Sequence, residues 1–193
     1  AAKENDWLLL RSSVNDDALL GYESLAKELD DVFSSPSPLQ GEGGGEVVGQ
    51  KDGRPLSNSP LVKGRGTDHH GSIFIPSSSG TLAVGLHKFL KSKPAFHIVQ
   101  TIKVNTLIKK FDQDFVPEEK SLADAIVDLI GHRRPQIEKI ITNSGGFGWA
   151  ISNKEIESAR EELKEAGIEC LNTSALGLAG FKKALAKKIQ ING

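Results

Sequence analysis

The second half of the chain alternates short apolar runs with stretches in which apolar residues recur at helical spacing. Residues 73–75 (Ile-Phe-Ile) form a run typical of a buried strand, and Pro76 ends it. Small polar residues follow, and the apolar spacing then predicts a helix over residues 82–89. The next apolar run, residues 96–100, is a second strand candidate. A strand, a helix and a strand in this order predict a parallel crossover.

The same rules assign the rest of the chain to short elements. The spacing predicts helices over residues 17–32, 121–130, 135–142, 153–166 and from residue 175 onward, and strands over residues 7–10, 147–151 and 168–171. Residues 105–111 are predicted to be a short helix or turn. The expected helix signals are an N-cap at Asn15 or Asp16, a capping box at Ser152 and Glu155, and helix-ending glycines at Gly131 and Gly167. In the last helix the expected buried residues are Ala175, Leu178, Ala179, Phe181 and Leu185, and the expected solvated residues are Lys182, Lys183, Lys187 and Lys188.

This order of elements predicts an α/β fold, a three-layer sandwich whose mainly parallel sheet is flanked by helices. A chain of 193 residues can bury one sizeable core. Residues 1–33 and 72–193 are therefore predicted to form one domain, with residues 34–71 as an insert.

The insert differs in composition from the rest of the chain. It holds nine of the twenty glycines and four of the eight prolines, and it lacks a periodic apolar face. Such a segment is predicted to be disordered or loosely packed. It is similar to the translation of a dispersed bacterial intergenic repeat, which indicates an insertion without a selected function; a mobile lid or partner-binding loop is the alternative. His69 and His70 lack a further ligand at suitable spacing, so no metal site is predicted.

The charge balance narrows the classes of partner. Lys and Arg number 24 against 25 for Asp and Glu, so neither nucleic acid nor an anionic membrane is an expected partner. The single cysteine, Cys170, is predicted to be a buried strand residue. One cysteine cannot form a disulfide within the chain, which fits a reducing cytoplasm. No apolar run approaches the roughly 20 residues that span a bilayer. The chain contains no Met, which indicates a piece of a longer cytoplasmic protein.

The turn Ser77–Thr81, between the first strand and its helix, is the candidate binding site. A helix N-terminus presents unpaired N–H groups and the positive end of the helix dipole, and small residues leave a phosphate access to them. A plain surface turn with a Ser or Thr N-cap is the alternative. No lysine follows the turn as in a nucleotide P-loop, and GxGxxG is absent.

Four segments in the same order resemble the C-terminal part of fold-type II pyridoxal-phosphate enzymes, closest to threonine synthase. They are LGYESLAKEL (20–29), IFIPSSSGTLAVGLHKF (73–89), SLADAIVDLIGHRRPQIEKIITNSGG (121–146) and AISNKEIESAREELKEAGIECLNTSALGLAGFKKAL (150–185). The resemblance runs from Asp6 to the end of the chain, apart from the insert. It implies a tryptophan synthase beta-like fold and pyridoxal 5'-phosphate as cofactor. It also implies a lyase of threonine biosynthesis that converts O-phosphohomoserine to threonine and phosphate.

The resemblance places five residues at the cofactor: Ser78, Ser79, Gly80 and Thr81 at its phosphate, and Thr173 at its pyridine nitrogen. A hydroxyl partner does not hold that nitrogen protonated, which favours elimination and replacement over transamination. Ser174 is the neighbouring alternative for this contact, and a helix N-cap is the alternative role of Thr173. Residues 144–146 (Ser-Gly-Gly) are expected near the cofactor or its supporting wall.

The resemblance also implies what this chain lacks. The family's Schiff-base lysine and its substrate-carboxylate loop lie upstream of Ala1. Leu20 stands where the family has an acidic residue, and residues 171–172 (Leu-Asn) stand where it has Glu-Pro. The chain alone is therefore not expected to catalyse. Its expected partners are an amino-acid substrate and either the missing N-terminal portion or a second copy of itself. The alternatives are a non-catalytic module for a phosphate-bearing ligand, a decayed remnant, or a dehydratase-like or other β-replacement enzyme acting on serine or threonine.

Overall fold

The computed structural model describes residues 11–34 and 71–189 of the chain. Three parallel strands form its sheet, in the order β1 (Ser72–Pro76), β2 (Ala95–Thr101) and β3 (Gly148–Ile151). The helix α2 (Thr81–Phe89) connects β1 to β2, so the predicted parallel crossover is confirmed. The predicted strand over residues 7–10 and residues 35–70 of the predicted insert lie outside the described residues.

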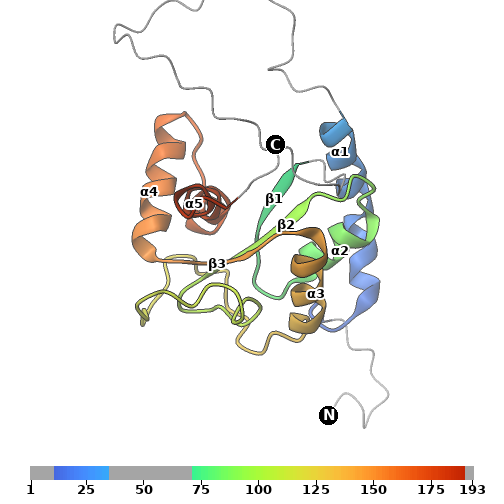
Figure 1. Cartoon of the computed structure of the whole chain (residues 1–193), viewed down its shortest axis with the longest axis horizontal. Coiled ribbons are helices and arrows are strands. Elements are labelled where there is room, and N and C mark those ends of the chain that lie inside the picture. The colour runs from blue at the N-terminus through green and yellow to red at the C-terminus, as the bar shows by residue number, and fades with distance from the viewer. Residues whose placement is uncertain (1–10, 35–70, 190–193) are drawn as a thin grey trace, which may run out of the picture.

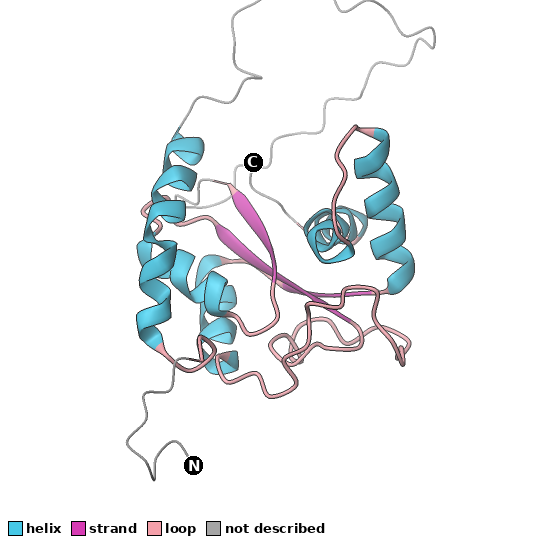
Figure 2. Ribbon diagram, turned by 180° about the vertical axis from the view of Figure 1, so that it is seen from behind, coloured by secondary structure: helices cyan, strands magenta, loops and turns pink. Residues whose placement is uncertain are grey.

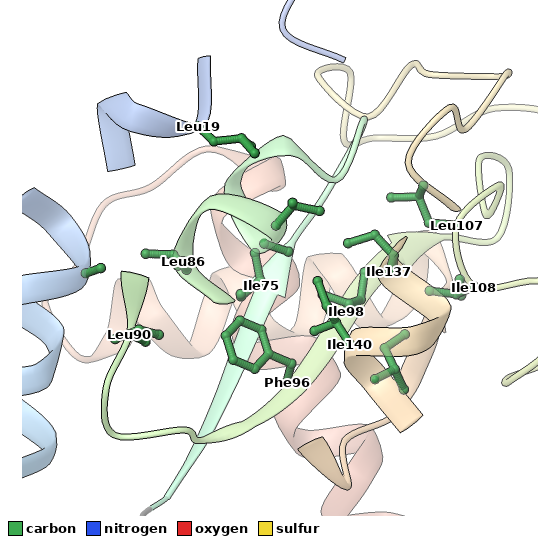
Figure 3. Packing of buried hydrophobic residues seen from close by; sticks show 14 of the residues in the cluster. Leu19, Ile75, Leu86, Leu90, Phe96, Ile98, Leu107, Ile108, Ile137 and Ile140 are labelled. Atoms are coloured by element: carbon green, nitrogen blue, oxygen red, sulfur yellow. The ribbon is translucent and has the colours of Figure 1, made fainter. Parts of the chain in front are cut away.

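Helices cover both faces of the sheet (Figures 1 and 2). On one face lie the 3-10 helix η1 (Asp16–Tyr22), α1 (Glu23–Ser34), α2 and α3 (Arg134–Ser144), and on the other lie α4 (Asn153–Glu165) and α5 (Asn172–Ala186). Each face buries its own apolar cluster. Ile75, Phe96 and Ile98 belong to the first, which Figure 3 shows, and Val99 and Trp149 to the second. The fold is α/β with a parallel sheet, compatible with the predicted three-layer sandwich.

The central strand β2 is buried along its whole length. Its neighbours pair in parallel register, with Ile73 opposite Phe96 and Val99 opposite Trp149. A parallel strand covered by helices on both faces is buried at every position, so it is rich in apolar residues, here Phe96, Ile98 and Val99. The strand also carries His97, which is fully buried.

Two aromatic side chains contact His97. Its ring stacks on Phe74 at a centroid distance of 4.3 Å, and its Nδ1 accepts a hydrogen bond from Nε1 of Trp149 at 3.3 Å. Its Nε2 has no partner among the described residues. Burial lowers the pKa of His97 to about 4. The imidazole is therefore neutral in the folded protein at neutral pH.

We expect His97 to make the fold acid-sensitive. Because its pKa is lower in the folded than in the unfolded chain, the unfolded chain binds more protons between about pH 6.5 and pH 4, and stability falls as pH falls through that window. The full loss is about 3 kcal/mol. Urea unfolding at several pH values measures it. His97→Phe keeps a ring beside Phe74 but cannot titrate, so an equally steep pH dependence in that variant would contradict the assignment.

The local helix signals are largely confirmed. Asn15 accepts a hydrogen bond from the amide of Asp17 at 2.8 Å, and Ser152 and Glu155 form the predicted capping box. Gly167 follows α4 with φ of +80°. The predicted helix over residues 17–32 is divided into η1 and α1, with Gly21, a weak helix former, beside the junction. Residues 105–111 form turns.

The predicted helix over residues 121–130 is wrong, because these residues form turns and bends. Side chains take the amide groups that a helix would have used. Ser78 Oγ accepts from the amides of Val127 and Asp128, and Asp128 Oδ1 accepts from those of Ile130 and Gly131. Gly131, with φ of +65°, therefore ends a side-chain-capped turn and not a helix.

The predicted strand over residues 168–171 is also wrong. The amide of Ile168 donates back to the carbonyl of Leu163 at 2.8 Å, as at other helix ends that close with a left-handed glycine. Ile168 and Leu171 are exposed, by 52% and 76%, and no described strand pairs with this segment. Cys170 is consequently a half-buried loop residue rather than a buried strand residue.

The helix α5 packs through a different side than predicted. Ala175 and Ala179 are buried as predicted, but Phe181 and Leu185 are exposed. The remaining buried positions are Leu176, Gly180 and Ala184. A Cβ at Gly180 would lie 2.7 Å from Val99, so α5 approaches the sheet closely at this small residue. Leu178, also predicted to be buried, is half-buried against the same cluster.

Two of the four lysines predicted to be solvated are ion-paired with a buried carboxylate. Lys183 and Lys187 contact Asp112 at 2.8 and 3.1 Å, and the Asp112 side chain is 1% exposed. Lys183 also donates to the carbonyl of Ala150, whose amide donates to Asp112. Asp112 and Lys183 thus provide hydrogen-bond partners for the backbone groups of β3 that face away from β2. Among the described residues, no helix is both long and apolar enough to cross a membrane.

Candidate functional site

The candidate site begins where β1 ends. The amide of Ser77 donates to the carbonyl of Val99 at 2.9 Å, and the chain then leaves the carboxyl edge of the sheet. Gly80 has φ of +85°, and a Cβ there would lie 2.9 Å from Ile137, so this position requires glycine. The first amide of α2 with a backbone acceptor is that of Val84. The amides of residues 81–83 thus have no backbone acceptor among the described residues, as expected for a helix N-terminus.

Some of the hydroxyl hydrogens of the turn are used in hydrogen bonds within the protein, and one is not. Thr81 Oγ1 donates to the carbonyl of Ser12 at 3.2 Å, so the 2.9 Å contact between Ser79 Oγ and Thr81 Oγ1 uses the Ser79 hydrogen. Ser78 Oγ instead accepts two amide hydrogens, at 3.0 and 3.1 Å. A hydroxyl has one hydrogen to donate, and that of Ser78 remains available to a ligand.

The turn forms one wall of a hollow of about 470 Å³. Two other segments, distant in sequence, supply the remaining walls. The lining residues are Arg11, Ser12, Ser13, Ser78, Ser79, Val127, Asp128, Leu129 and Ile130. Of the four predicted phosphate-binding residues, Ser78 and Ser79 line the hollow. Gly80 and Thr81 do not, although Thr81 Oγ1 contacts Ser79 and Ser12 of the lining.

Ser13 lines the hollow and carries an unpartnered, buried hydroxyl. The residue is 3% exposed, and its Oγ has no hydrogen-bond partner among the described residues. A buried hydroxyl without a partner costs free energy, and a ligand oxygen in the hollow would relieve that cost. Ser13 was not predicted from the sequence, because the 11–13 segment reaches the turn only through the tertiary fold.

Asp128 adds an acceptor to this set of donors. Its Oδ1 accepts from two amides, whereas its buried Oδ2 has no partner among the described residues. A carboxylate repels a fully ionised phosphate and accepts a hydrogen bond from a protonated one. Arg11, which lines the same hollow, offsets the negative charge. The site therefore fits an oxyanion that carries a hydrogen or a neighbouring donor.

The side chain of Gln100, on the neighbouring strand β2, fixes the conformation of the turn. It is fully buried at the end of β2, and its Nε2 donates to the carbonyls of Ser77 and Ser78 at 2.9 and 3.3 Å. Its Oε1 accepts from the amide of Leu107 at 2.8 Å. Because the Gln100 side chain occupies the carbonyls of Ser77 and Ser78, these two acceptors are not free to repel an anion in the hollow.

Thr173 does not line the hollow. It is one helical turn before Gly177, where a Cβ would lie 3.6 Å from the carbonyl of Phe74 and 3.9 Å from Pro76, the residue before the turn. Residues four apart share a face of a helix, so Thr173 faces the region beyond Pro76. Its Oγ1 is buried without a partner among the described residues, which excludes the alternative role as a side-chain N-cap of α5.

Residues 144–146, which are expected near the cofactor or its supporting wall, lie at the opposite edge of the sheet from the Ser77–Thr81 turn. Ser144 Oγ accepts from the amide of Phe96, near the start of β2, and a Cβ at Gly146 would lie 1.8 Å from the carbonyl of Phe96. The role of these residues is to join α3 to the amino end of the sheet. No lysine among the described residues lines the hollow.

No family model and no curated protein matches the chain.

Proposed function

We propose that the chain is the C-terminal part of a pyridoxal-phosphate enzyme resembling threonine synthase, and that the hollow at the N-terminus of α2 holds the cofactor phosphate. The observation that supports this most is a set of unpaired donors near the start of α2. They are the first amides of α2, the free hydrogen of Ser78 and the buried hydroxyl of Ser13, and the last two belong to residues that line one hollow. Such a set matches the acceptor oxygens of a phosphate ester.

In this proposal each end of the cofactor has a partner. Ser78, Ser79, Gly80 and Thr81 hold the phosphate through the helix N-terminus, and Thr173 offers its unpartnered hydroxyl to the pyridine nitrogen. The cofactor, when bound, supplies an electron sink for bonds at the substrate α carbon. The residues of this chain bind and orient it. The proposed overall reaction of the complete enzyme is conversion of O-phosphohomoserine to threonine and phosphate, in the cytoplasm.

A non-catalytic module that binds a phosphate-bearing ligand is the second candidate. The absence of a lysine from the lining of the hollow, within the described part of the chain, favours it. Both candidates require phosphate binding, and they differ in whether a second polypeptide portion supplies the missing lysine.

We expect the chain to bind 4'-deoxypyridoxine 5'-phosphate and not 4'-deoxypyridoxine. The probe has the ring and phosphate of the cofactor but no aldehyde, so it cannot react with surface lysines. Titration calorimetry at neutral pH measures both ligands. Equal binding of the two compounds, or binding of neither, would contradict the phosphate site.

Thr173→Val tests the ring end in the same titrations. It should weaken binding of the ring-bearing probe about tenfold, the effect of one hydrogen bond, and leave inorganic phosphate binding unchanged. Thr142→Val, on the exposed side of α3, is the matched control and should change neither. Loss of inorganic phosphate binding in Thr173→Val would show that this residue only supports the fold.

A further inference from the structure

Arg133 is a buried cation beside the proposed phosphate site. It lies at the start of α3 and is 3% exposed. Its guanidinium donates to the carbonyls of Ser12 and Asn15 at 2.9 and 3.0 Å. It also donates to Asp16 at 2.9 Å and to Gln136 at 3.2 Å. Three of these four acceptors belong to the segment 12–16, which is more than a hundred residues away in the sequence.

The carbonyl of Ser12 is held from two sides. Nη2 of Arg133 donates to it at 2.9 Å, and Thr81 Oγ1, at the first residue of α2, donates to it at 3.2 Å. One backbone oxygen therefore links Arg133 to the N-terminus of α2. The peptide plane that contains this oxygen also contains the amide of Ser13, so the two bonds fix the orientation of Ser13.

The ion pair with Asp16 does not explain why Arg133 is buried. The Asp16 side chain is 71% exposed, and an ion pair with such a partner contributes little to stability. The backbone contacts are the better explanation, since a planar guanidinium can bind two carbonyl oxygens in a fixed geometry. In addition, Nε of Arg133 is buried without a partner among the described residues.

We propose that Arg133 is a positioning residue of the phosphate site: it fixes the peptide at Ser12 so that the Ser13 hydroxyl is directed at the bound phosphate ester. This inference rests on the proposed function. Arg133 does not line the hollow and need not touch the ligand. Its effect on ligand affinity passes through Ser13.

The test is a double-mutant cycle on affinity for 4'-deoxypyridoxine 5'-phosphate. Ser13→Ala should weaken binding about tenfold, and Arg133→Lys should do the same, because an ammonium cannot hold both carbonyls in the guanidinium geometry. In the Ser13→Ala background, Arg133→Lys should change affinity less than twofold. Gln136→Ala, which removes the one Arg133 partner outside segment 12–16, should leave affinity unchanged.

Stability is measured in parallel by urea unfolding, so that a purely structural role is recognised. If Arg133→Lys lowers stability but leaves affinity unchanged, or weakens binding equally in both backgrounds, the inference is overturned while the phosphate site stands. If the wild-type chain does not bind the probe, the proposed function fails and the inference with it. Should Arg133→Lys not fold, Arg133→Gln, whose side chain is too short to hold the carbonyls of both Ser12 and Asn15, takes its place. It must then show the same dependence on Ser13, and independence from Ser13 would overturn the inference.

Discussion

Replacing Gly146 by alanine should leave little folded protein at 25 °C. The new Cβ would lie 1.8 Å from the carbonyl oxygen and 2.4 Å from the carbonyl carbon of Phe96, both in the backbone of the central strand. Neither atom can move without breaking the register of β2, so we expect a loss of more than about 4 kcal/mol in the free energy of unfolding. Circular dichroism and urea unfolding measure this loss.

Gly145→Ala is the matched control for Gly146→Ala. Gly145 has φ of +72°, but a Cβ there would meet no atom within 4 Å. Only the left-handed backbone is penalised, at about 1 kcal/mol. The pair also tests the location of this segment. If residues 144–146 were a wall of the cofactor site, Gly146→Ala would fold normally and lose ligand binding; that outcome would contradict the structure.

Asp112→Ala should cost about 3–5 kcal/mol, the range for removing one partner of a buried ion pair. The substitution leaves Lys183, whose side chain is 12% exposed, without its carboxylate, and it removes the acceptor of the Ala150 amide. Glu162→Ala is the control. It removes the partner of Lys182 in a pair whose side chains are 41% and 53% exposed, and should cost less than about 1 kcal/mol. A loss below about 1 kcal/mol for Asp112→Ala would contradict the assigned role.

The stabilisation by Asp112 also has a definite pH range. Burial acts to raise the pKa of Asp112, but the hydrogen bond and charge of Lys183, together with the hydrogen bonds from Lys187 and the Ala150 amide, outweigh burial, and the pKa lies below its ordinary value. A carboxyl group with a lowered pKa stabilises the fold above its unfolded pKa, about 3.9, and loses this effect as pH falls through the folded value. The loss occurs at lower pH than that caused by His97, so unfolding at pH 5 separates the two.

The sequence predicts the elements whose signals are local. The strand before Pro76, the turn, the helix α2 and the strand β2 occur where the apolar pattern places them. The capping box at Ser152 and the left-handed Gly167 are likewise as predicted, because each depends on residues within one helical turn. These signals were sufficient to predict a parallel α/β fold and to place Ser78–Thr81 at a helix N-terminus.

Most of the errors and omissions have a different cause, which is competition from distant groups. The apolar spacing of residues 121–130 is helical, but the side chain of Ser78 binds the amides of Val127 and Asp128. Lys183 was predicted to be solvated because nothing local identifies Asp112 as its partner. Ser13 and Arg133 carry no motif, and only the fold reveals that they adjoin the turn.

The central claim is that the amides at the N-terminus of α2 and the hydroxyl of Ser13 hold a phosphate ester. Two-dimensional ¹H–¹⁵N spectra of the chain, titrated with 4'-deoxypyridoxine 5'-phosphate, test it most directly. We predict saturable shifts at the amides of Ser13, Gly80, Thr81 and Leu82, with none on titration of the unphosphorylated compound. Shifts confined to another surface, such as the 480 Å³ hollow beside Arg160 and Lys164, would contradict the claim.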